Sequence, residues 1–361
     1  MRKNMIFGAV AAVAVAIVAC QQAKQENGQA LVIEKQGWFA VGGQVIQREG
    51  EFDPKAFNSW TEVDEAGQTL HCDHAMVHFQ VPQGAKQVPM VFVHGFGGSG
   101  LCWEATGDPE QEGFSTLMQR RGYSTYVMDL LGRGRASRTS QTVEVKPQAA
   151  EQFWFGIWRG GIWPNFNEGV QFRKDEEYLK QFFSQGVPNL SDGSQDIPAI
   201  NALLEKLPQG AILTTHSAGG IPGWMVAAGN DRVKAVVAYE PGGYVFPESE
   251  MPEPIPGLTG GCPMIPVPME AFEALTKVPI VIYMGDFIPE EPSENLGDEN
   301  WRVRLIGARK FVEAIEKHGG KATLVELPKI GIKGNTHMLF QDLNNAELAD
   351  VLVKWLKEQK L

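Results

Sequence analysis

The segment Thr215-His216-Ser217-Ala218-Gly219 carries the strongest chemical signal in the chain. It follows a short apolar run, residues 211–215, and precedes a helix-like run that includes Trp224. A serine on a sharp turn between a strand and a helix exposes its hydroxyl above the sheet, where it can attack a carbonyl carbon. The usual pattern of such an elbow is Gly-x-Ser-x-Gly, and Thr215 replaces its first glycine. Ser217 is therefore a candidate nucleophile on a motif that needs further support.

Chain order supplies that support, because an acid and then a histidine should follow the serine of such an elbow. Of the seven histidines, His318 and His337 follow Ser217. His318 falls in the last turn of a predicted helix before two glycines, where a cation complements the helix dipole. His337 falls in a loop, residues 334–337, between the last predicted strand and the last predicted helix. We therefore predict that His337 is the base.

Two carboxylates compete for the role of the acid. Glu240 ends the apolar run 236–239, and Asp286 follows the run 280–285. Either carboxylate could orient the imidazole and stabilise the imidazolium that forms. On general grounds of fold, Asp286 is the default.

Two backbone N–H groups should hold the oxyanion of the tetrahedral intermediate. One is expected from Ala218, directly after the nucleophile, and the other from the glycine-rich loop 94–100 that follows an early strand. Phe96 is the predicted donor in that loop. His94 precedes the glycine turn, and we expect it to be a structural hydrogen-bonding group.

Short apolar runs without clean alternation are typical of strands that are buried on both faces. Helix-like segments separate most of them, which predicts a mostly parallel sheet flanked by helices. The predicted helices at the end of the chain are residues 300–318 and 345–358. The predicted strands cover residues 76–81, 88–94, 124–130, 211–215, 233–239, 279–284 and 322–327.

Two stretches depart from this rhythm, and we expect them to be lid or cap insertions that shape a pocket. Residues 151–183 are crowded with aromatic side chains, and residues 241–268 are rich in proline and glycine. The second stretch is too long for an ordinary connection. The alternative for the aromatic residues is a satellite core beneath a surface excursion.

The amino-terminal residues resemble an export signal. Arg2 and Lys3 precede an uncharged run that is too short to span a bilayer comfortably. Residues 17–20, Ile-Val-Ala-Cys, resemble the lipobox of bacterial lipoproteins, which implies cleavage before a lipid-modified Cys20. A simple secretory signal is the alternative. Gln21 after the cysteine favours the outer membrane, facing the periplasm or the cell surface.

The expected organisation is a signal peptide over residues 1–19, a tether over 20–36 and one domain over 37–361, with cap insertions near 150–190 and 241–270. An oxidising compartment permits one disulfide and one free thiol among Cys72, Cys102 and Cys262.

Composition and weak motifs argue against several other functions. A net charge of −11 provides no basic field for nucleic acid. Residues 132–135, Gly-Arg-Gly-Arg, lack the third glycine of a dinucleotide site, so no cofactor is expected. His71, Asp73, His74 and His78 cluster, but no third and fourth ligand follow at suitable spacing, so no metal is expected either.

Five segments of the chain match a known pattern: residues 93–104, 121–129, 132–135, 334–338 and 341–345. Together they resemble the bacterial secreted α/β-hydrolase esterases, and the resemblance covers most of the chain from about residue 88. The resemblance implies the α/β-hydrolase fold with a lid insertion, and a glutamate acid after the strand that follows the nucleophile helix. That position is Glu240, so the resemblance overrides the default and leaves Asp286 as the alternative acid. The family has an adjacent cysteine pair where this chain has Phe96-Gly97.

These parts predict a serine hydrolase that cleaves carboxylic esters of small molecules through an acyl-enzyme. Lactonases, thioesterases and carbon–carbon bond hydrolases use the same parts, and the sequence does not separate them. A lipoprotein that kept the fold as a binding module is the non-enzyme alternative. The sequence does not determine the oligomeric state.

Overall fold

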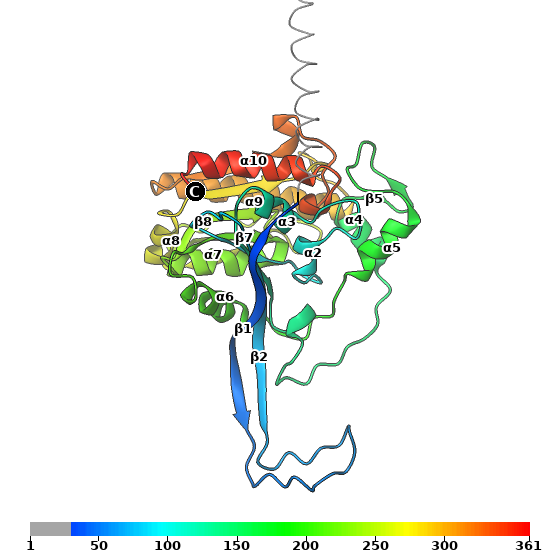
Figure 1. Cartoon of the computed structure of the whole chain (residues 1–361). Coiled ribbons are helices and arrows are strands. Elements are labelled where there is room, and N and C mark those ends of the chain that lie inside the picture. Colours follow the sequence, from blue (N-terminus) through cyan, green and yellow to red (C-terminus); the bar gives the residue numbers. More distant parts are fainter. Residues whose placement is uncertain (1–29) are drawn as a thin grey trace, which may run out of the picture.

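The protein is built around one eight-stranded sheet, and its computed structural model describes residues 30–361 (Figure 1). Strand β2 pairs antiparallel with β1 on one side and with β4 on the other. All the remaining pairs of neighbouring strands, from β4–β3 to β11–β12, are parallel. In spatial order the strands are β1 (Ile33–Gln47), β2 (Thr69–Pro82), β4 (Thr125–Asp129), β3 (Met90–Val93), β7 (Ala211–His216), β8 (Val233–Tyr239), β11 (Ile280–Met284) and β12 (Ala322–Glu326).

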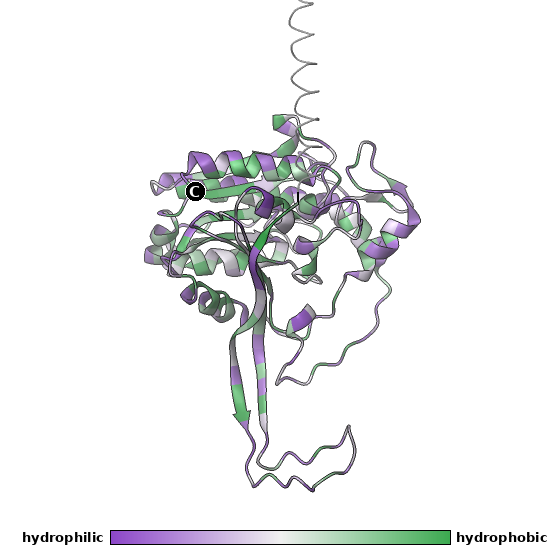
Figure 2. Cartoon of the chain, viewed as in Figure 1, coloured by the Kyte–Doolittle hydropathy of each residue, from purple (hydrophilic) through white to green (hydrophobic). Residues whose placement is uncertain are grey.

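Helices cover both faces of this sheet, and each face has its own apolar core. One core packs α6 to α9 on the sheet, and the other packs α2, α3 and α10 on the opposite face. Helix α10 carries both hydrophilic and hydrophobic residues along its length, as expected for an outer helix (Figure 2). The helices are α2 (Leu101–Glu104), α3 (Phe114–Arg120), α4 (Glu151–Ile157), α5 (Glu176–Ser184), α6 (Asp196–Glu205), α7 (Gly220–Gly229), α8 (Met269–Leu275), α9 (Leu296–Lys317) and α10 (Asn345–Glu358).

The predicted fold class is confirmed, and all seven predicted strands are present with ends that shift by a few residues, except for β2. That strand begins at Thr69 instead of residue 76. Strand β1 was not predicted from the sequence, although it pairs with β2 over its whole length. The two strands form an arm that extends from the body of the molecule (Figure 1). Since most β1 side chains are exposed, the strand has no continuous apolar run to reveal it.

The amino-terminal predictions are only partly covered by the described residues. Residues 1–29, which include the predicted signal peptide and Cys20, lie outside them. The tether was expected to extend to residue 36, but Ile33 already belongs to β1, so residues 33–36 form part of the sheet. Within residues 30–361, no helix is long and apolar enough to cross a membrane.

The cysteines of the described region correct a second expectation. Cys72, Cys102 and Cys262 are all free and buried, so none of them pairs with another. Each lies in a different part of the fold, on β2, on α2 and in the loop before β10 (Met264–Val267) respectively. A buried cysteine without a partner behaves as a small apolar side chain.

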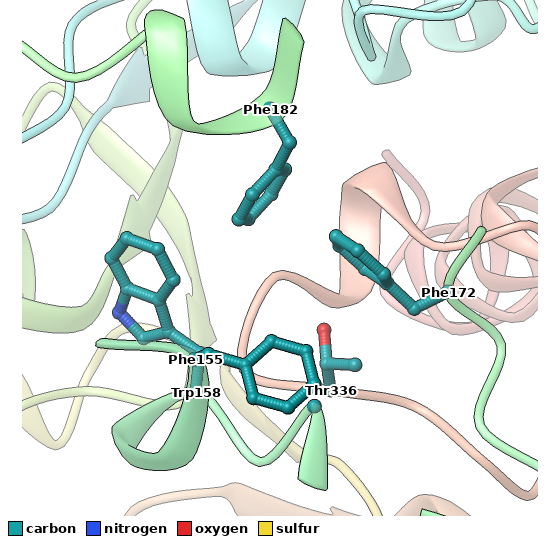
Figure 3. Close-up of a pocket in the computed structure, with 6 residues that line it drawn as sticks. Phe155, Trp158, Phe172, Phe182 and Thr336 are labelled. Atoms are coloured by element: carbon teal, nitrogen blue, oxygen red, sulfur yellow. The ribbon is translucent and has the colours of Figure 1, made fainter. Parts of the chain in front are cut away.

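The aromatic insertion, residues 151–183, combines the two roles that the sequence analysis treated as alternatives. It contains α4, the hairpin of β5 (Gly161–Ile162) and β6 (Asn165–Phe166), and all of α5 except its last residue. The rings of Phe155, Trp158, Phe172 and Phe182 close around a space of about 10 Å³ beside Thr336 (Figure 3). Its inner side is therefore core. Phe153, Trp154 and Trp158 line the larger cavity described below.

The second insertion, residues 241–270, is packed more deeply than a lid. Its strands β9 (Tyr244–Pro247) and β10 pair in parallel, and β9 contacts α7, α8 and α9. Tyr244, Val245 and Phe246 are buried in the larger core. The loops of this segment still supply Gly242, Thr259 and Pro263 to the cavity wall.

Candidate active site

Ser217 lies on a sharp turn between β7 and α7, as the motif predicted. It has a φ of 50°, a left-handed conformation that is costly for a residue with a side chain. Glycines allow the chain to pack around this turn. A Cβ atom on Gly95 would lie 2.8 Å from the Ser217 Cβ, and one on Gly219 would lie 2.6 Å from the His94 carbonyl oxygen. The turn therefore holds the serine hydroxyl at the carboxyl end of the sheet.

Thr215 fits at the position of the missing glycine because the residue that packs against it, Gly223, has no side chain. A Cβ atom on Gly223, one turn into α7, would lie 2.6 Å from the Thr215 Cγ2. Close packing of helix on strand therefore depends here on a glycine of the helix, whereas the usual motif has a glycine on the strand. The departure from Gly-x-Ser-x-Gly therefore does not disturb the elbow.

His337 and Glu240 form a buried pair beside Ser217. The His337 Nδ1 lies 2.6 Å from the Glu240 Oε2, and the two side chains are 3% and 0% exposed. The same carboxylate also binds Arg159, whose side chain is fully buried, through both guanidinium Nη atoms. The N–H of Gly285 donates to the Glu240 Oε1 over 2.7 Å. Both oxygens of Glu240 are therefore satisfied without water.

The charges around this pair favour an ionised acid and a neutral base. Burial alone would raise the pKa of Glu240, but the Arg159 charge and the His337 hydrogen bond outweigh it and lower the pKa. Burial lowers the pKa of His337 below its ordinary 6.5; the Glu240 hydrogen bond opposes this, while Arg159 and Arg304 add to it. At neutral pH the imidazole is therefore uncharged and can accept a proton.

Asp286, the alternative acid, has other partners. Its carboxylate accepts hydrogen bonds of 2.7 Å from the N–H of Phe287 and 2.7 Å from the N–H of Gly334. It neither bonds to His337 nor lines the cavity around Ser217. Asp286 therefore orders the loop that carries the histidine, while Glu240 contacts the imidazole.

The loop of His337 is fixed on both sides by its backbone. The His337 N–H donates to the Trp158 carbonyl oxygen over 2.9 Å, and its own carbonyl lies 3.1 Å from the His216 Nε2. Burial keeps the pKa of His216 well below its ordinary value, so a neutral ring donates this bond. Gln171 in the aromatic insertion also donates to the Gly334 carbonyl over 2.7 Å. The insertion is thus bonded directly to the loop that carries the base.

The two predicted oxyanion donors lie at this same edge of the sheet. Ala218 is the second residue of the short 3-10 helix Ser217–Gly219, where the first N–H groups have no partner within the helix. Phe96 lies in the turn that the Gly98 N–H closes onto the Gly95 carbonyl at 3.4 Å. Within residues 30–361 the Phe96 N–H has no hydrogen-bond partner. Both donors border one cavity.

That cavity has a volume of about 400 Å³ and joins the serine, the histidine and the two donors. Its wall includes Trp301, whose ring lies 4.0 Å from the His337 ring, and the partly buried Arg304. A second cavity of about 540 Å³ adjoins it, because Phe96, Trp154 and Trp158 line both. The arrangement can bind a molecule larger than an acetyl ester.

Several functional candidates were missed by the sequence analysis. Arg159, Trp301 and Arg304 all contact the site, yet they come from the aromatic insertion and from α9, which are distant in sequence from Ser217. No local motif marks them. Of the six described residues other than glycine with positive φ, Ser217, Glu240 and Arg159 belong to this site. Such strain is visible only in the folded chain.

The weaker sequence signals have structural partners. The His94 Nδ1 lies 2.9 Å from the Gly95 carbonyl, and its Nε2 accepts from the Leu130 N–H over 3.2 Å, so the expected structural role is confirmed. His78 pairs with Glu104 at 2.8 Å. The described part of the chain contains no group of three or more His, Cys, Asp or Glu residues that could hold a metal ion.

Comparison with known proteins agrees with this geometry. Residues 90–330 match the model of the alpha/beta hydrolase family, so the chain belongs to that family. A probable secreted lipase of a fungus (Fungal sp., strain ATCC 74256) is 28% identical over 313 residues, which cover 77% of this chain and 84% of the lipase. The solved structure of a novel bacterial esterase is 28% identical, with a TM-score of 0.73 over 92% of this chain and 98% of that chain. The family and these relatives are consistent with hydrolysis of carboxylic esters.

Proposed function

We propose that this protein is a serine carboxylic ester hydrolase with the triad Ser217, His337 and Glu240. The observation that carries the proposal is the buried 2.6 Å contact between Glu240 and His337, because His337 lines the same cavity as Ser217. A carboxylate on one ring nitrogen fixes the tautomer and leaves the other nitrogen free to accept the serine proton.

The reaction proceeds through an acyl-enzyme. His337 takes the proton of the Ser217 hydroxyl as the oxygen attacks the ester carbonyl, and the N–H groups of Phe96 and Ala218 hold the oxyanion. The imidazolium then protonates the departing alcohol. A water molecule, deprotonated by the same imidazole, attacks the acyl carbon and releases the acid, which restores the serine.

Arg159 acts as a positioning residue in this mechanism. Its two contacts hold both oxygens of Glu240, and its Nε donates to the Asp286 carbonyl over 2.7 Å. Without a cation nearby, burial would raise the pKa of the carboxyl group, and the group would lose its charge. The guanidinium therefore keeps Glu240 ionised, so that it can stabilise the imidazolium that forms during the reaction.

Lactones, thioesters and ketones with a cleavable carbon–carbon bond remain alternative substrates, because the same parts attack each of them. Esters are preferred because the lipase and the bacterial esterase both share 28% identity with this chain. A binding module without turnover would have no need of a strained Ser217 or of a neutral buried histidine.

The protein is exported and carries a lipid on Cys20, which anchors it to a bacterial outer membrane. The similarity to a secreted lipase supports export, and the lipobox-like residues 17–20 and Gln21 support the anchor. Metabolic labelling with a fatty-acid probe tests the anchor. Labelling should be lost in Cys20→Ser, and equal labelling of both proteins would exclude it.

The function is tested with 4-nitrophenyl esters of increasing acyl length and with a fluorophosphonate probe. The protein should hydrolyse the esters and take up one probe on Ser217, while Ser217→Ala should do neither. Activity in Ser217→Ala would place the nucleophile elsewhere. Probe labelling without ester turnover would favour lactones or thioesters as substrates. The absence of both labelling and turnover would favour the binding module.

A further inference from the structure

Arg304 is an unusual residue in the cavity that contains Ser217. It comes from α9, one turn after Asn300, and its guanidinium donates only to neutral oxygens. The Nε donates to the Gly242 carbonyl over 3.1 Å, and the Nη1 donates to the Asn300 carbonyl over 2.8 Å and to the Asn300 Oδ1 over 2.6 Å. Within the described chain its Nη2 has no partner. The guanidinium also lies over the Trp301 ring, with its Cζ 5.6 Å from the ring centroid, so the Nη2 end is the part that has no hydrogen-bond partner beside the site.

The positive charge of Arg304 is also unbalanced. On the same helix, Arg302 pairs with Glu299. Arg309 pairs with both Glu290 and Glu326. No carboxylate among residues 30–361 lies within ion-pair distance of Arg304. The one buried carboxylate of the site, Glu240, already pairs with Arg159.

The titratable groups that face Arg304 do not supply the missing charge. They are Cys262, Tyr244 and His337, and the Arg304 charge itself helps to keep His337 neutral. Burial raises the pKa of the Cys262 thiol to about 11 and holds the pKa of the Tyr244 phenol well above its ordinary value. Both groups are neutral at pH 7. A partly buried cation without a counter-charge is unfavourable, and it becomes favourable when a ligand brings the anion.

Asn300 adds a second donor to the same wall. Its Oδ1 accepts hydrogen bonds from Arg304 and, over 2.9 Å, from the Thr259 hydroxyl. Because a guanidinium can only donate, these contacts fix which side of the amide is oxygen. The Asn300 Nδ2 has no partner among the described residues, although the side chain lines the cavity. Two unsatisfied donors from adjacent turns of α9 thus border the space next to Ser217.

From these observations we infer that Arg304 and Asn300 form an anion subsite, and that the preferred substrates are esters that also carry a carboxylate. This inference rests on the proposed function and names its substrate class. The carboxylate accepts from the Arg304 Nη2 and the Asn300 Nδ2 while Ser217 attacks the ester carbonyl. The subsite acts in binding only, so the chemical steps at Ser217 and His337 are those described above.

The test compares each anionic ester with its neutral methyl ester, which has nearly the same shape. One pair carries the carboxylate on the acyl side, mono-4-nitrophenyl adipate against 4-nitrophenyl methyl adipate. The other carries it on the alcohol side, 4-acetoxybenzoate against methyl 4-acetoxybenzoate. In at least one pair, kcat/KM should be about 10-fold to 100-fold higher for the anion, as expected for a charge-assisted hydrogen bond.

Variants on α9 separate substrate binding from a structural role. Arg304→Met should bring the ratio of anionic to neutral kcat/KM close to about one, and Arg304→Lys should retain part of the preference. Arg309→Met removes a positive charge from the same helix at a site paired with Glu290 and Glu326, and it should leave the ratio unchanged. Equal losses on both esters in Arg304→Met would show a structural role and overturn the inference.

Binding measurements keep the inference testable if turnover is absent. In the Ser217→Ala protein, calorimetry should detect tighter binding of the preferred anionic ester than of its methyl ester, and this difference should vanish when Arg304→Met is added. Hydrolysis of neutral esters without any anionic preference would overturn the subsite and leave the proposed function intact. Tighter binding of the anionic ester without hydrolysis of any ester would support the subsite and overturn the proposed function.

Discussion

The ends of β8 and β11 lie side by side, and each strand is followed by a carboxylate, but the two carboxylates have different surroundings. Glu240 after β8 is fully buried, and among the described residues its carboxylate is bound by Arg159, His337 and the Gly285 N–H. Asp286 after β11 is half-buried and accepts hydrogen bonds only from backbone N–H groups. Glu240 therefore faces the imidazole, while Asp286 holds the loop in place.

This difference shows what selects the acid of the site. Both carboxylates occur at the correct edge of the sheet, so strand order does not distinguish them. A buried carboxylate needs a cation to remain charged, and Arg159 from the aromatic insertion supplies it at Glu240. The insertion therefore contributes to the choice of acid as well as to the shape of the cavity.

The largest expected effect is at Glu240. Glu240→Gln should lower kcat/KM by about 10⁴-fold, because the amide can no longer hold the correct tautomer or stabilise the imidazolium. Asp286→Asn, the matched change on the neighbouring strand, should lower it by less than about 10-fold. Steady-state kinetics on a 4-nitrophenyl ester measures both. The larger loss in Asp286→Asn would reverse the assignment of the two acids.

Arg159 should give the next largest effect. Arg159→Met should lower kcat by about 10²-fold with a smaller change in KM, because Glu240 loses the cation that keeps it ionised and oriented. Arg159→Lys should recover part of the activity, since it keeps the charge but not the two-pronged geometry. Thermal unfolding must show that both variants are folded. A loss confined to KM would instead indicate a substrate contact.

Asp286 should matter more for stability than for chemistry. Asp286→Ala removes two hydrogen bonds to the backbone and should lower the free energy of unfolding by about 2 kcal/mol. Asp286→Asn keeps an acceptor and should cost about half as much. Urea unfolding followed by tryptophan fluorescence measures both changes. Unchanged stability in Asp286→Ala would mean that the loop of His337 is held by its other contacts alone.

The smallest effect concerns pH. The pKa of His337 lies below 6.5 in the folded protein, so its imidazole stays neutral and active until the pH falls through that lowered value. The acidic limb of kcat/KM should therefore lie below pH 6.5. Glu240→Gln removes the negative charge beside His337 that raises its pKa, and in pH profiles of kcat/KM it should move this limb to lower pH. Asp286→Asn should leave it in place, and equal shifts in both variants would contradict the distinction between the two acids.

Much of the site could be predicted because its signals are local. Ser217 and His337 follow from a short motif, from chain order and from the strands beside them. The choice of Glu240 came from the family resemblance, since physical reasoning on the sequence favoured Asp286. The aromatic insertion was recognised, but its division between core and cavity wall was left open, because ring composition does not specify which ring faces inward.

The sequence by itself determined the parallel sheet, the turn that carries Ser217 and the loop that carries His337, since apolar runs and turn residues act over a few neighbouring positions. The tertiary structure decided everything that depends on burial and charge between distant segments. Arg159 meets Glu240 across 81 positions. Arg304 remains without a carboxylate even though its neighbours on α9 have them. Such pairings follow from which groups share a dry interior, and that is fixed only when the chain is folded.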